Sequence, residues 1–171
     1  MIFVTVGTHE QPFNRLVEYV DQLKKEKIIE EEVFIQSGYT TYEPKYCKFS
    51  KLIPYSDMQK YIQKARIVIT HGGPASFIMP LQVGKVPVVV PRQKKYGEHV
   101  NDHQLEFAQE VEKRKKNIIL IDNIEKLKDI IINYDDIVSN LNCGIDGNNE
   151  QFNKKLSEIV DEMFQKRGTA R

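Results

Sequence analysis

The sequence predicts an α/β protein built on a Rossmann-like, doubly wound parallel sheet. Two observations carry this prediction. Short β-branched runs, such as Ile67–Thr70 and Val86–Val90, alternate along the chain with segments of helical periodicity. The runs are also almost wholly apolar, which is typical of parallel strands that helices cover on both faces. The chain of 171 residues has the length of one domain, and we assign residues 1–171 to a single domain.

The predicted strands are short runs rich in Val, Ile and Phe. The pattern is weakest in the third run, which starts at a cysteine and contains two lysines. In chain order, the predicted strands are Ile2–Val6, Glu32–Ser37, Cys47–Leu52, Ile67–Thr70, Val86–Val90 and Ile118–Ile121.

The predicted helices carry apolar residues at helical spacing or recognisable end signals. Ser56 is the expected N-cap of the second helix, and Gly84 stands where a C′ glycine ends the third. A polar loop over 139–150 leads to the last helix, whose apolar face lies within Gln151–Phe164. In chain order, the predicted helices are Phe13–Glu26, Ser56–Ala65, Ala75–Val83, Asn101–Lys113, Ile124–Ile132 and 151–167.

The composition sets limits on location and partners. Lys and Arg number 25 against 24 Asp and Glu, so the net charge of +1 gives no argument for nucleic acid. Cys47 and Cys143 follow no pairing rule, which favours a reducing cytoplasm. The start of the chain lacks the basic segment of a signal peptide, and no apolar run has the length of roughly 20 residues that spans a bilayer.

The segment His71–Ser76 combines the end of a strand, a glycine turn and the start of a helix. Two glycines are followed by Pro74, a residue that suits the first position of a helix. Unpaired backbone N–H groups and the positive end of the helix dipole meet at such a point, which is a common binding site for phosphate. A tight turn without a ligand would use the same residues, so this alternative stays open.

Glycines and polar residues also follow the other predicted strands. Gly7-Thr8-His9-Glu10 follows the first strand, Ser37-Gly38-Tyr39-Thr40 the second, and Pro91-Arg92-Gln93 the fifth. The carboxyl ends of parallel strands meet at one edge of the sheet, which is where ligands of open α/β sheets bind. The spacing matches neither the G-x-G-x-x-G dinucleotide fingerprint nor the P-loop.

Together, these motifs resemble the donor-binding half of a GT-B glycosyltransferase, of the glycosyltransferase family 28 C-terminal type. The resemblance runs from Met1 to about Ala108 and is greatest to split bacterial capsule or exopolysaccharide β-1,4-galactosyltransferases. It extends to the catalytic subunit of the eukaryotic dolichol-linked GlcNAc transferase and to the C-terminal domain of the enzyme that makes lipid II. The motifs that carry it are Phe3–Thr8, Tyr55–Met58, Thr70–Ser76, Gly84–Arg92 and Glu98–Gln104.

The resemblance implies roles for particular residues. Tyr55 lies where relatives place a residue beside the uracil. Met79 replaces a glutamate that binds the ribose in relatives, so Gln93 and Glu98 are the candidates for that role here. The donor sugar would be bound by Asn101, Asp102 and Gln104. The diphosphate would be bound by Gly7, Thr8, His71, Gly72, Gly73, Pro74, Ala75 and Ser76.

The catalytic base is the least defined part of the site. His9 and Glu10, at the tip of the first loop, are the candidates within this chain, and a partner protein is the alternative source. His99 and His103 are four residues apart, as metal ligands on a helix can be, but no third ligand accompanies them. We therefore expect neither a metal nor another cofactor. Arg92 follows a strand at the binding edge, where a role at a ligand or an interface is plausible.

The sequence thus predicts an inverting hexosyltransferase subunit that uses a UDP-sugar, with galactose as the first candidate. The implied acceptor is a lipid-linked saccharide in capsular or exopolysaccharide synthesis. A GT-B enzyme needs two domains, so we expect a membrane-anchored acceptor-binding subunit that holds this chain at the inner face of the membrane. The alternatives are a non-catalytic nucleotide-sugar-binding regulatory subunit and half of a nucleotide-sugar epimerase, because fold alone does not fix function.

Overall fold

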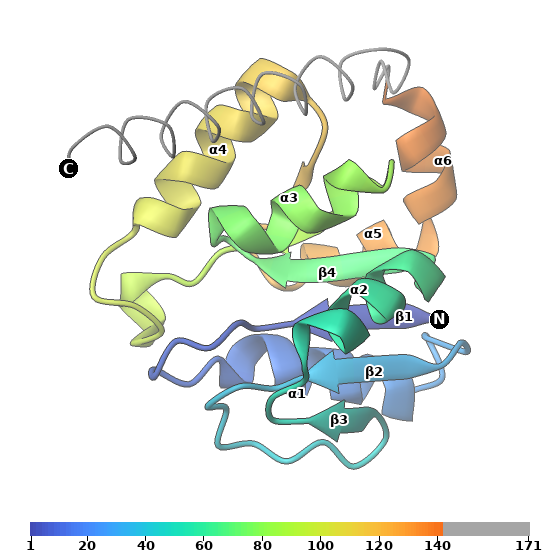
Figure 1. Cartoon of the computed structure of the whole chain (residues 1–171), viewed down its shortest axis with the longest axis vertical. Helices are drawn as coiled ribbons and strands as arrows, with labels where there is room; N and C mark the ends of the chain where they lie inside the picture. Colours follow the sequence, from blue (N-terminus) through green and yellow to red (C-terminus); the bar gives the residue numbers. More distant parts are fainter. Residues whose placement is uncertain (142–171) are drawn as a thin grey trace, which may run out of the picture. The chain divides into compact units, whose positions relative to one another are not determined.

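The computed structural model describes residues 1–141, which form a parallel sheet of six strands in the order β3-β2-β1-β4-β5-β6 (Figure 1). Every pair of neighbouring strands is parallel. The predicted doubly wound sheet is therefore confirmed. The strands are β1 (Ile2–Thr5), β2 (Val33–Gln36), β3 (Lys48–Ser50), β4 (Ile67–His71), β5 (Val88–Val90) and β6 (Ile119–Leu120).

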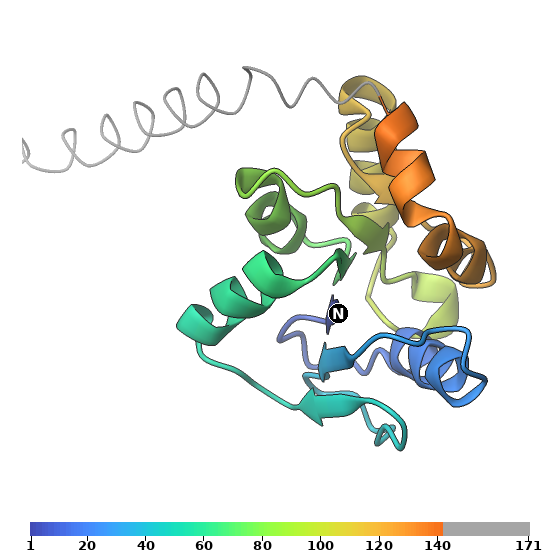
Figure 2. The same cartoon turned by 90° about the vertical axis from the view of Figure 1, so that its right-hand side faces the viewer.

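Helices cover both faces of this sheet. Helices α1 and α5 lie on one face, whereas α2 and α3 lie on the other (Figures 1 and 2). The chain moves from β1 toward β3 and then crosses back to β4, and right-handed crossovers in opposite directions place their helices on opposite faces. The helices are α1 (Asn14–Lys25), α2 (Tyr55–Lys64), α3 (Pro74–Gln82), α4 (His103–Lys115), α5 (Lys126–Ile132) and α6 (Tyr134–Asn140), with a 3₁₀ turn at Lys94–Tyr96.

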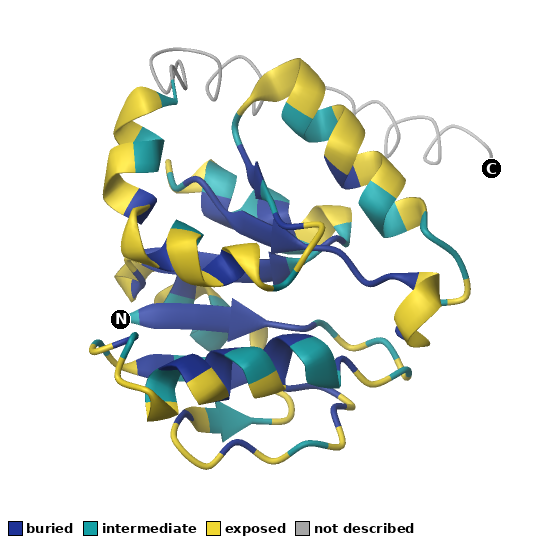
Figure 3. Ribbon diagram, turned by 180° about the vertical axis from the view of Figure 1, so that it is seen from behind, coloured by how far each residue is buried: buried dark blue, intermediate teal, exposed yellow. Residues whose placement is uncertain are grey.

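The strands form the centre of the core, and the helices expose their outer faces (Figure 3). Alternate residues of each strand supply the two faces. Phe3 and Val68 pack with Ile62 and Ala65 on the side of α2. Further along the sheet, Phe77, Val89, Ala108 and Ile118 join α3 and α4 to β5.

Several element boundaries differ from those predicted. The assignment of Ser56 as N-cap is wrong, because α2 begins at Tyr55 after Pro54, whose φ of −58° and ψ of 151° provide the extended entry. Helix α4 begins at His103 rather than Asn101, with Asp102 at the N-cap. Strand β5 starts after Pro87, since proline has no N–H to donate to the ladder. Helix α6 occupies residues that were not predicted to be helical.

Gly84 is confirmed as the C′ residue of α3, with a φ of +74°. The N–H of Gly84 bonds to Leu81 O at 3.0 Å and that of Lys85 to Pro80 O at 2.9 Å, which is the Schellman pattern. The Lys85 ammonium then donates to carbonyls at the end of α2, among them Ile62 O at 2.8 Å. This turn therefore ends one helix and completes the end of another.

The predicted C-terminal helix over 151–167 lies outside the described residues, as do Cys143 and the predicted loop from residue 142 on. The single-domain assignment over 1–171 therefore stays a prediction. Among residues 1–141, none of the helices combines the length and apolar character needed to traverse a bilayer.

Asp21 fixes the connection between β2 and β3. Its side chain is 1 % exposed, and its carboxylate accepts hydrogen bonds from Tyr42 Oη (2.8 Å) and from the N–H groups of Lys45, Tyr46 and Cys47 (2.8–2.9 Å). Burial alone would raise the pKa of Asp21, but these hydrogen bonds outweigh it and lower the pKa below its ordinary value. The bonds thus stabilise the charged form.

We predict that Asp21→Asn lowers the free energy of unfolding by about 2–3 kcal/mol at neutral pH, because an amide cannot accept all four bonds. Since folding lowers this pKa, the contribution of Asp21 is complete above its unfolded value and is lost as pH falls through the folded one. The difference from wild type in denaturant unfolding should therefore shrink in acid. Asp57→Asn is the control, because the half-buried Asp57 forms only a solvent-accessible ion pair with Lys60, and its expected loss is below about 0.5 kcal/mol.

Candidate functional site

The candidate site lies at the carboxyl edge of the sheet between β1 and β4. The chain leaves β1 toward β2 and leaves β4 toward β5, so the loops after these two strands diverge at this edge, which is where ligands of open α/β sheets bind. The β1–α1 loop starts at Val6, and Gly72 and Gly73 form the turn between β4 and α3. The loop after β5 runs from Pro91 to Asp102 and completes this edge.

The His71 ring fills the space between Gly7 and Gly73. Its Nδ1 accepts the N–H of Gly73 at 3.0 Å. A Cβ on Gly73 would lie 2.3 Å from His71 Cε1, and one on Gly7 would lie 2.5 Å from His71 Nε2. Gly7 also has a φ of +76°, which favours glycine. Both glycines are therefore required by the imidazole, whether or not a phosphate approaches them.

His71 is a neutral side chain at physiological pH. Burial, and next the positive charge of Arg92, lower its pKa to about 4. Because Nδ1 accepts a hydrogen bond, the tautomer we assign carries the proton on Nε2, the atom nearest Gly7. His71 is thus positioned to donate a hydrogen bond without carrying charge.

The N-terminus of α3 is open to solvent at Pro74 and Ala75, and Pro74 takes the predicted first helical position. The two glycine N–H groups already have partners, since Gly72 donates to Gln104 Oε1 at 3.1 Å and Gly73 donates to His71. What this end offers an anion is therefore the helix dipole and the first-turn backbone at Ala75. The Ser76 hydroxyl is engaged with Gly73 O at 2.6 Å.

Arg92 lies at this edge and is fully buried, so its side chain is held by the protein's own backbone, and a role for Arg92 at a ligand or an interface stays a prediction. Its guanidinium donates to Val6 O (2.9 Å), Gln11 O (2.7 Å) and Glu98 O (3.2 Å) and packs 4.8 Å from the centre of the Phe13 ring. It therefore connects the loop after β1 to the loop after β5. Burial lowers the pKa of Arg92 to about 10, a value at which the side chain is still charged at neutral pH.

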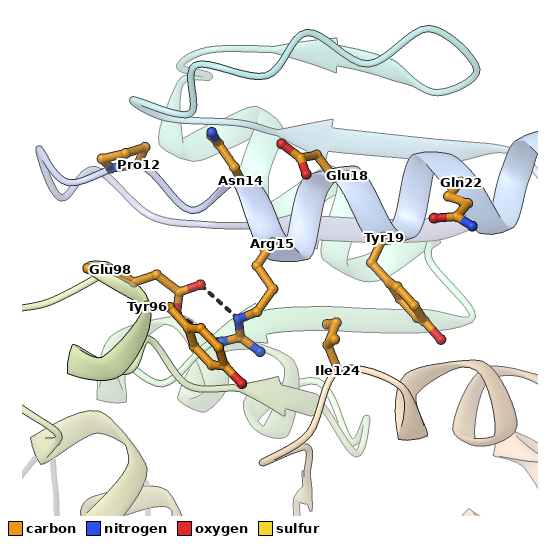
Figure 4. A pocket seen from close by; sticks show the side chains of 10 residues that line it. Pro12, Asn14, Arg15, Glu18, Tyr19, Gln22, Tyr96, Glu98 and Ile124 are labelled. Carbon is orange, nitrogen blue, oxygen red and sulfur yellow. Dashed lines mark hydrogen bonds and ion pairs between the residues drawn. The ribbon is translucent and has the colours of Figure 1, made fainter.

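A second arginine reaches the same region from α1. Arg15 forms a two-pronged ion pair with Glu98, at 2.8 and 2.9 Å, and packs 4.5 Å from the centre of the Tyr96 ring (Figure 4). A cavity of about 480 Å³ opens beside this pair, between α1 and the turn at Lys94–Tyr96. The Glu98 carboxylate is thus paired with Arg15, whereas Arg92 contacts only the main-chain carbonyl of Glu98 and keeps a positive charge without an ion-pair partner among residues 1–141.

Gln36 holds the start of the β1–α1 loop. Its Oε1 accepts the Thr5 hydroxyl at 2.7 Å and the Gly7 N–H at 3.2 Å. Its Nε2 donates to the carbonyls of Gly7 and Lys51 at 3.0 and 2.9 Å. This one buried amide fixes the backbone on both sides of Gly7.

The three predicted sugar-binding residues lie close together at the start of α4, but the side chains of all three already hold the protein's own backbone. Gln104 Oε1 accepts the N–H groups of Gly72 and Arg92 at 3.1 and 3.2 Å. Asp102 accepts the N–H of Lys94 at 2.8 Å, and Asn101 accepts that of His103 at 3.3 Å. Their contact with a sugar stays a prediction, alongside this positioning role.

Gln93 and Glu98, the predicted ribose ligands, are buried at 2 % and 3 % exposure. Glu98 accepts Arg15 and the Gln93 N–H, while the Gln93 amide donates to Asp122 O at 2.9 Å. The geometry gives both a positioning role and does not favour ribose binding. Tyr55, by contrast, is 65 % exposed and lines a small recess together with Met79.

The two predicted catalytic residues differ in exposure. Glu10 is exposed, whereas His9 is half-buried with its ring 4.7 Å from that of His99. His99 and His103 do not share a helix face, because α4 begins only at His103, which is exposed and near Glu106. Within residues 1–141, no group of three His, Cys, Asp or Glu side chains is placed to hold a metal ion.

The supporting residues were harder to find in the sequence. Gln36 stands at the end of an apolar strand. A polar residue at such a position is a signal that its side chain forms hydrogen bonds within the protein. The Arg15–Glu98 pair joins residues 83 apart in sequence, so no local pattern indicates it.

Comparisons with known proteins agree with this architecture. The chain matches the model of the glycosyltransferase family 28 C-terminal domain over residues 1–163. It is 36 % identical over 123 residues to the human UDP-N-acetylglucosamine transferase subunit ALG13, covering 66 % of this chain but only 10 % of that protein. The chain thus spans about a tenth of the length of this curated relative.

Solved structures show a similar fold at low identity. One is a glycosyltransferase of kitacinnamycin, with a TM-score of 0.50 and 16 % identity over 77 % of this chain and 34 % of that one. Another is the glycosyltransferase SnogD from Streptomyces nogalater, with a TM-score of 0.43 and 14 % identity over 82 % and 40 % of the two chains.

The parallel sheet and its loop-built carboxyl edge give this protein a Rossmann-like fold that matches the C-terminal domains of GT-B enzymes. The chain belongs to the glycosyltransferase family 28 C-terminal domain family, as its motifs predicted.

The packing of His71 against Gly73 gives a direct test of the turn. Gly73 has a φ of −72°, which alanine also adopts, so Gly73→Ala is opposed only by the imidazole. We predict a loss of about 1–3 kcal/mol in the free energy of unfolding. In a His71→Ala background, the same change should be neutral or stabilise the fold by about 0.5 kcal/mol. An equal loss in both backgrounds would contradict this account.

Proposed function

We propose that this chain is the donor-binding subunit of a UDP-sugar-dependent inverting hexosyltransferase, with galactose as the first candidate sugar. The chain would bind the nucleotide and orient C1 of the sugar, and an acceptor hydroxyl would displace UDP. The acceptor would be a lipid-linked saccharide in the synthesis of a capsule or exopolysaccharide. The family supports glycosyl transfer, and the name of the human relative supports a UDP-sugar donor.

One observation carries the proposal: the open N-terminus of α3 lies at the same sheet edge as the buried guanidinium of Arg92, whereas the nearby Arg15 is paired with Glu98. A diphosphate at this point would face the helix dipole, and the excess guanidinium charge would attract it from below. The same field would stabilise the charge that develops on the leaving diphosphate, which is preorganised electrostatic catalysis. No metal or other cofactor is part of this proposal.

The recess between α2 and α3 is our candidate for the nucleoside. Tyr55 presents an exposed ring there, and Met79 contributes an apolar wall, so a uracil could stack against the first and rest on the second. Met79 packs on the core and has no group that binds hydroxyls. Backbone or partner groups would therefore hold the ribose.

A second polypeptide would supply the acceptor site. The described sheet has one ligand-binding edge, and a GT-B enzyme places its acceptor on a facing domain. We propose a membrane-anchored partner that brings this chain to the inner face of the membrane and supplies the catalytic base if His9 and Glu10 do not. The described hollow of about 510 Å³ that Tyr39, Tyr42 and Lys51 help to line is open at this side for acceptor or partner contacts.

The diphosphate assignment can be tested by placing a charge at the start of α3. An acidic residue there suits the helix dipole, so Ala75→Glu should keep or raise stability by about 0.3–1 kcal/mol. The same charge should repel the diphosphate and weaken UDP binding at least tenfold, or about 1.4 kcal/mol, in calorimetric titration. Ala75→Gln is the uncharged control of equal size. Equal affinities of both variants for UDP would place the diphosphate elsewhere.

The transfer reaction is tested with the partner present. The chain, the protein that co-purifies with it and a lipid-linked acceptor should together release UDP from UDP-galactose, whereas the chain alone should not. Binding of the donor without turnover in the complete mixture would instead indicate a regulatory subunit. Conversion of one UDP-sugar to another without acceptor would indicate an epimerase.

A further inference from the structure

His9 and His99 form a pair of imidazoles that no catalytic or binding assignment above explains together. Their ring centres are 4.7 Å apart at an angle of 47°, and they come from two separate loops. Within the described residues, the Nε2 atom of His9 is buried and has no hydrogen-bond partner. His99 Nδ1 receives only a long contact, 3.4 Å, from the N–H of Asn101. The pair therefore has polar atoms that the protein itself leaves largely unused.

The pair lies close to the candidate diphosphate site. His9 and His99 are near enough to His71 to contribute to the lowering of its pKa. Their contributions are smaller than those of burial and of Arg92. The His71 ring in turn separates Gly7 from Gly73, the last residue before α3. Three imidazoles, from the end of β4 and from the loops after β1 and β5, thus gather at the edge where α3 begins.

The charged groups around the pair do not supply it with an anion. Arg92 lies below it and is positive, and the Glu98 carboxylate is committed to Arg15. Glu10 follows His9 in the chain but is exposed, and Glu106 lies beside the exposed His103. None of these carboxylates is therefore an ion-pair partner of the His9–His99 pair, and a bound diphosphate would supply the negative charge that the pair lacks.

Building on the proposed function, we propose that His9 and His99 are diphosphate-binding residues that together take up one proton when the nucleotide binds. The pair takes up one proton and not two, because two imidazolium rings at this separation would repel each other. The protonated pair then offers the diphosphate charged N–H donors in addition to the α3 dipole. His71 stays neutral beside them and donates through Nε2.

The four histidines of the chain make a direct measurement possible. The Cε1–H resonances of labelled histidine report the protonation of each ring directly. Protonation of the phosphates of UDP therefore does not affect this measurement. At about pH 7.5, saturating UDP should move the His9 and His99 signals toward those of imidazolium. His103, which is 78 % exposed at its side chain, is the internal reference and should not move.

Affinity provides the second readout. When the pH rises from about 6.5 to 8.5, the affinity of wild type for UDP should fall by about tenfold more than the affinity of the double variant His9→Gln/His99→Gln. The double variant lacks the histidines that would bind the linked proton. His103→Gln should follow the wild-type profile. Parallel profiles of wild type and double variant, or signals of His9 and His99 that stay in place when UDP is bound, would overturn the inference.

Inorganic pyrophosphate separates this inference from the proposed function. If UDP fails to bind but pyrophosphate moves the His9 and His99 signals, the nucleotide assignment fails and the proton-linked anion site stands. If UDP binds without moving them, the nucleotide site stands and the proton linkage fails. Absence of binding by either ligand would overturn both.

Discussion

The candidate site depends on one buried cation. Arg92 has no solvent exposure, and removing a guanidinium from water is costly unless its donors find partners. Here, Nη1 and Nη2 donate to main-chain carbonyls of Val6, Gln11 and Glu98, and the face of Phe13 covers the group, whereas Nε has no partner within residues 1–141. Because these carbonyls belong to the loops after β1 and β5, satisfying one charge fixes both loops. His9 and His99 are carried on those loops, so their meeting follows from the same contacts.

The arrangement around Arg92 also decides the sign of the local field. The Glu98 carboxylate accepts both prongs of Arg15, whereas Arg92 contacts only the main-chain carbonyl of Glu98, so the charge of Arg92 has no ion-pair partner in the described part of the chain. The remaining positive charge lies under the start of α3, where the helix dipole has the same sign. A lysine at position 92 could not replace this arrangement, since an ammonium lacks the planar set of donors that reaches three segments at once. An anion is therefore the ligand that we propose for this edge.

The fold was largely predictable because the periodicity of apolar residues in the sequence indicates most of its strands and helices. The β-branched runs ending near Thr70 and Val90 and the C′ glycine at Gly84 are local signals, and the structure bears them out. Local signals failed where a neighbouring residue sets the start of a helix. Pro54 is the N-cap of α2 in place of the expected Ser56.

The site was predictable in part. Motifs identified the turn at Gly72 and Gly73 but assigned its glycines to phosphate, whereas the ring of His71 and the chain near Gln104 already require them. The burial of Arg92 and Glu98 depends on contacts between distant loops, which no spacing in the sequence encodes. Polar residues at strand ends, such as Gln36, identify the right edge without revealing which of them bind a ligand.

A crystal structure of the chain with UDP tests the central claim most directly. The account predicts the diphosphate at the N-terminus of α3, within hydrogen-bond reach of the Ala75 backbone and the imidazoles of His9 and His99, with the uracil beside Tyr55. UDP bound instead in the cavity beside Arg15 and Tyr96, or in the hollow lined by Tyr39 and Lys51, would contradict it.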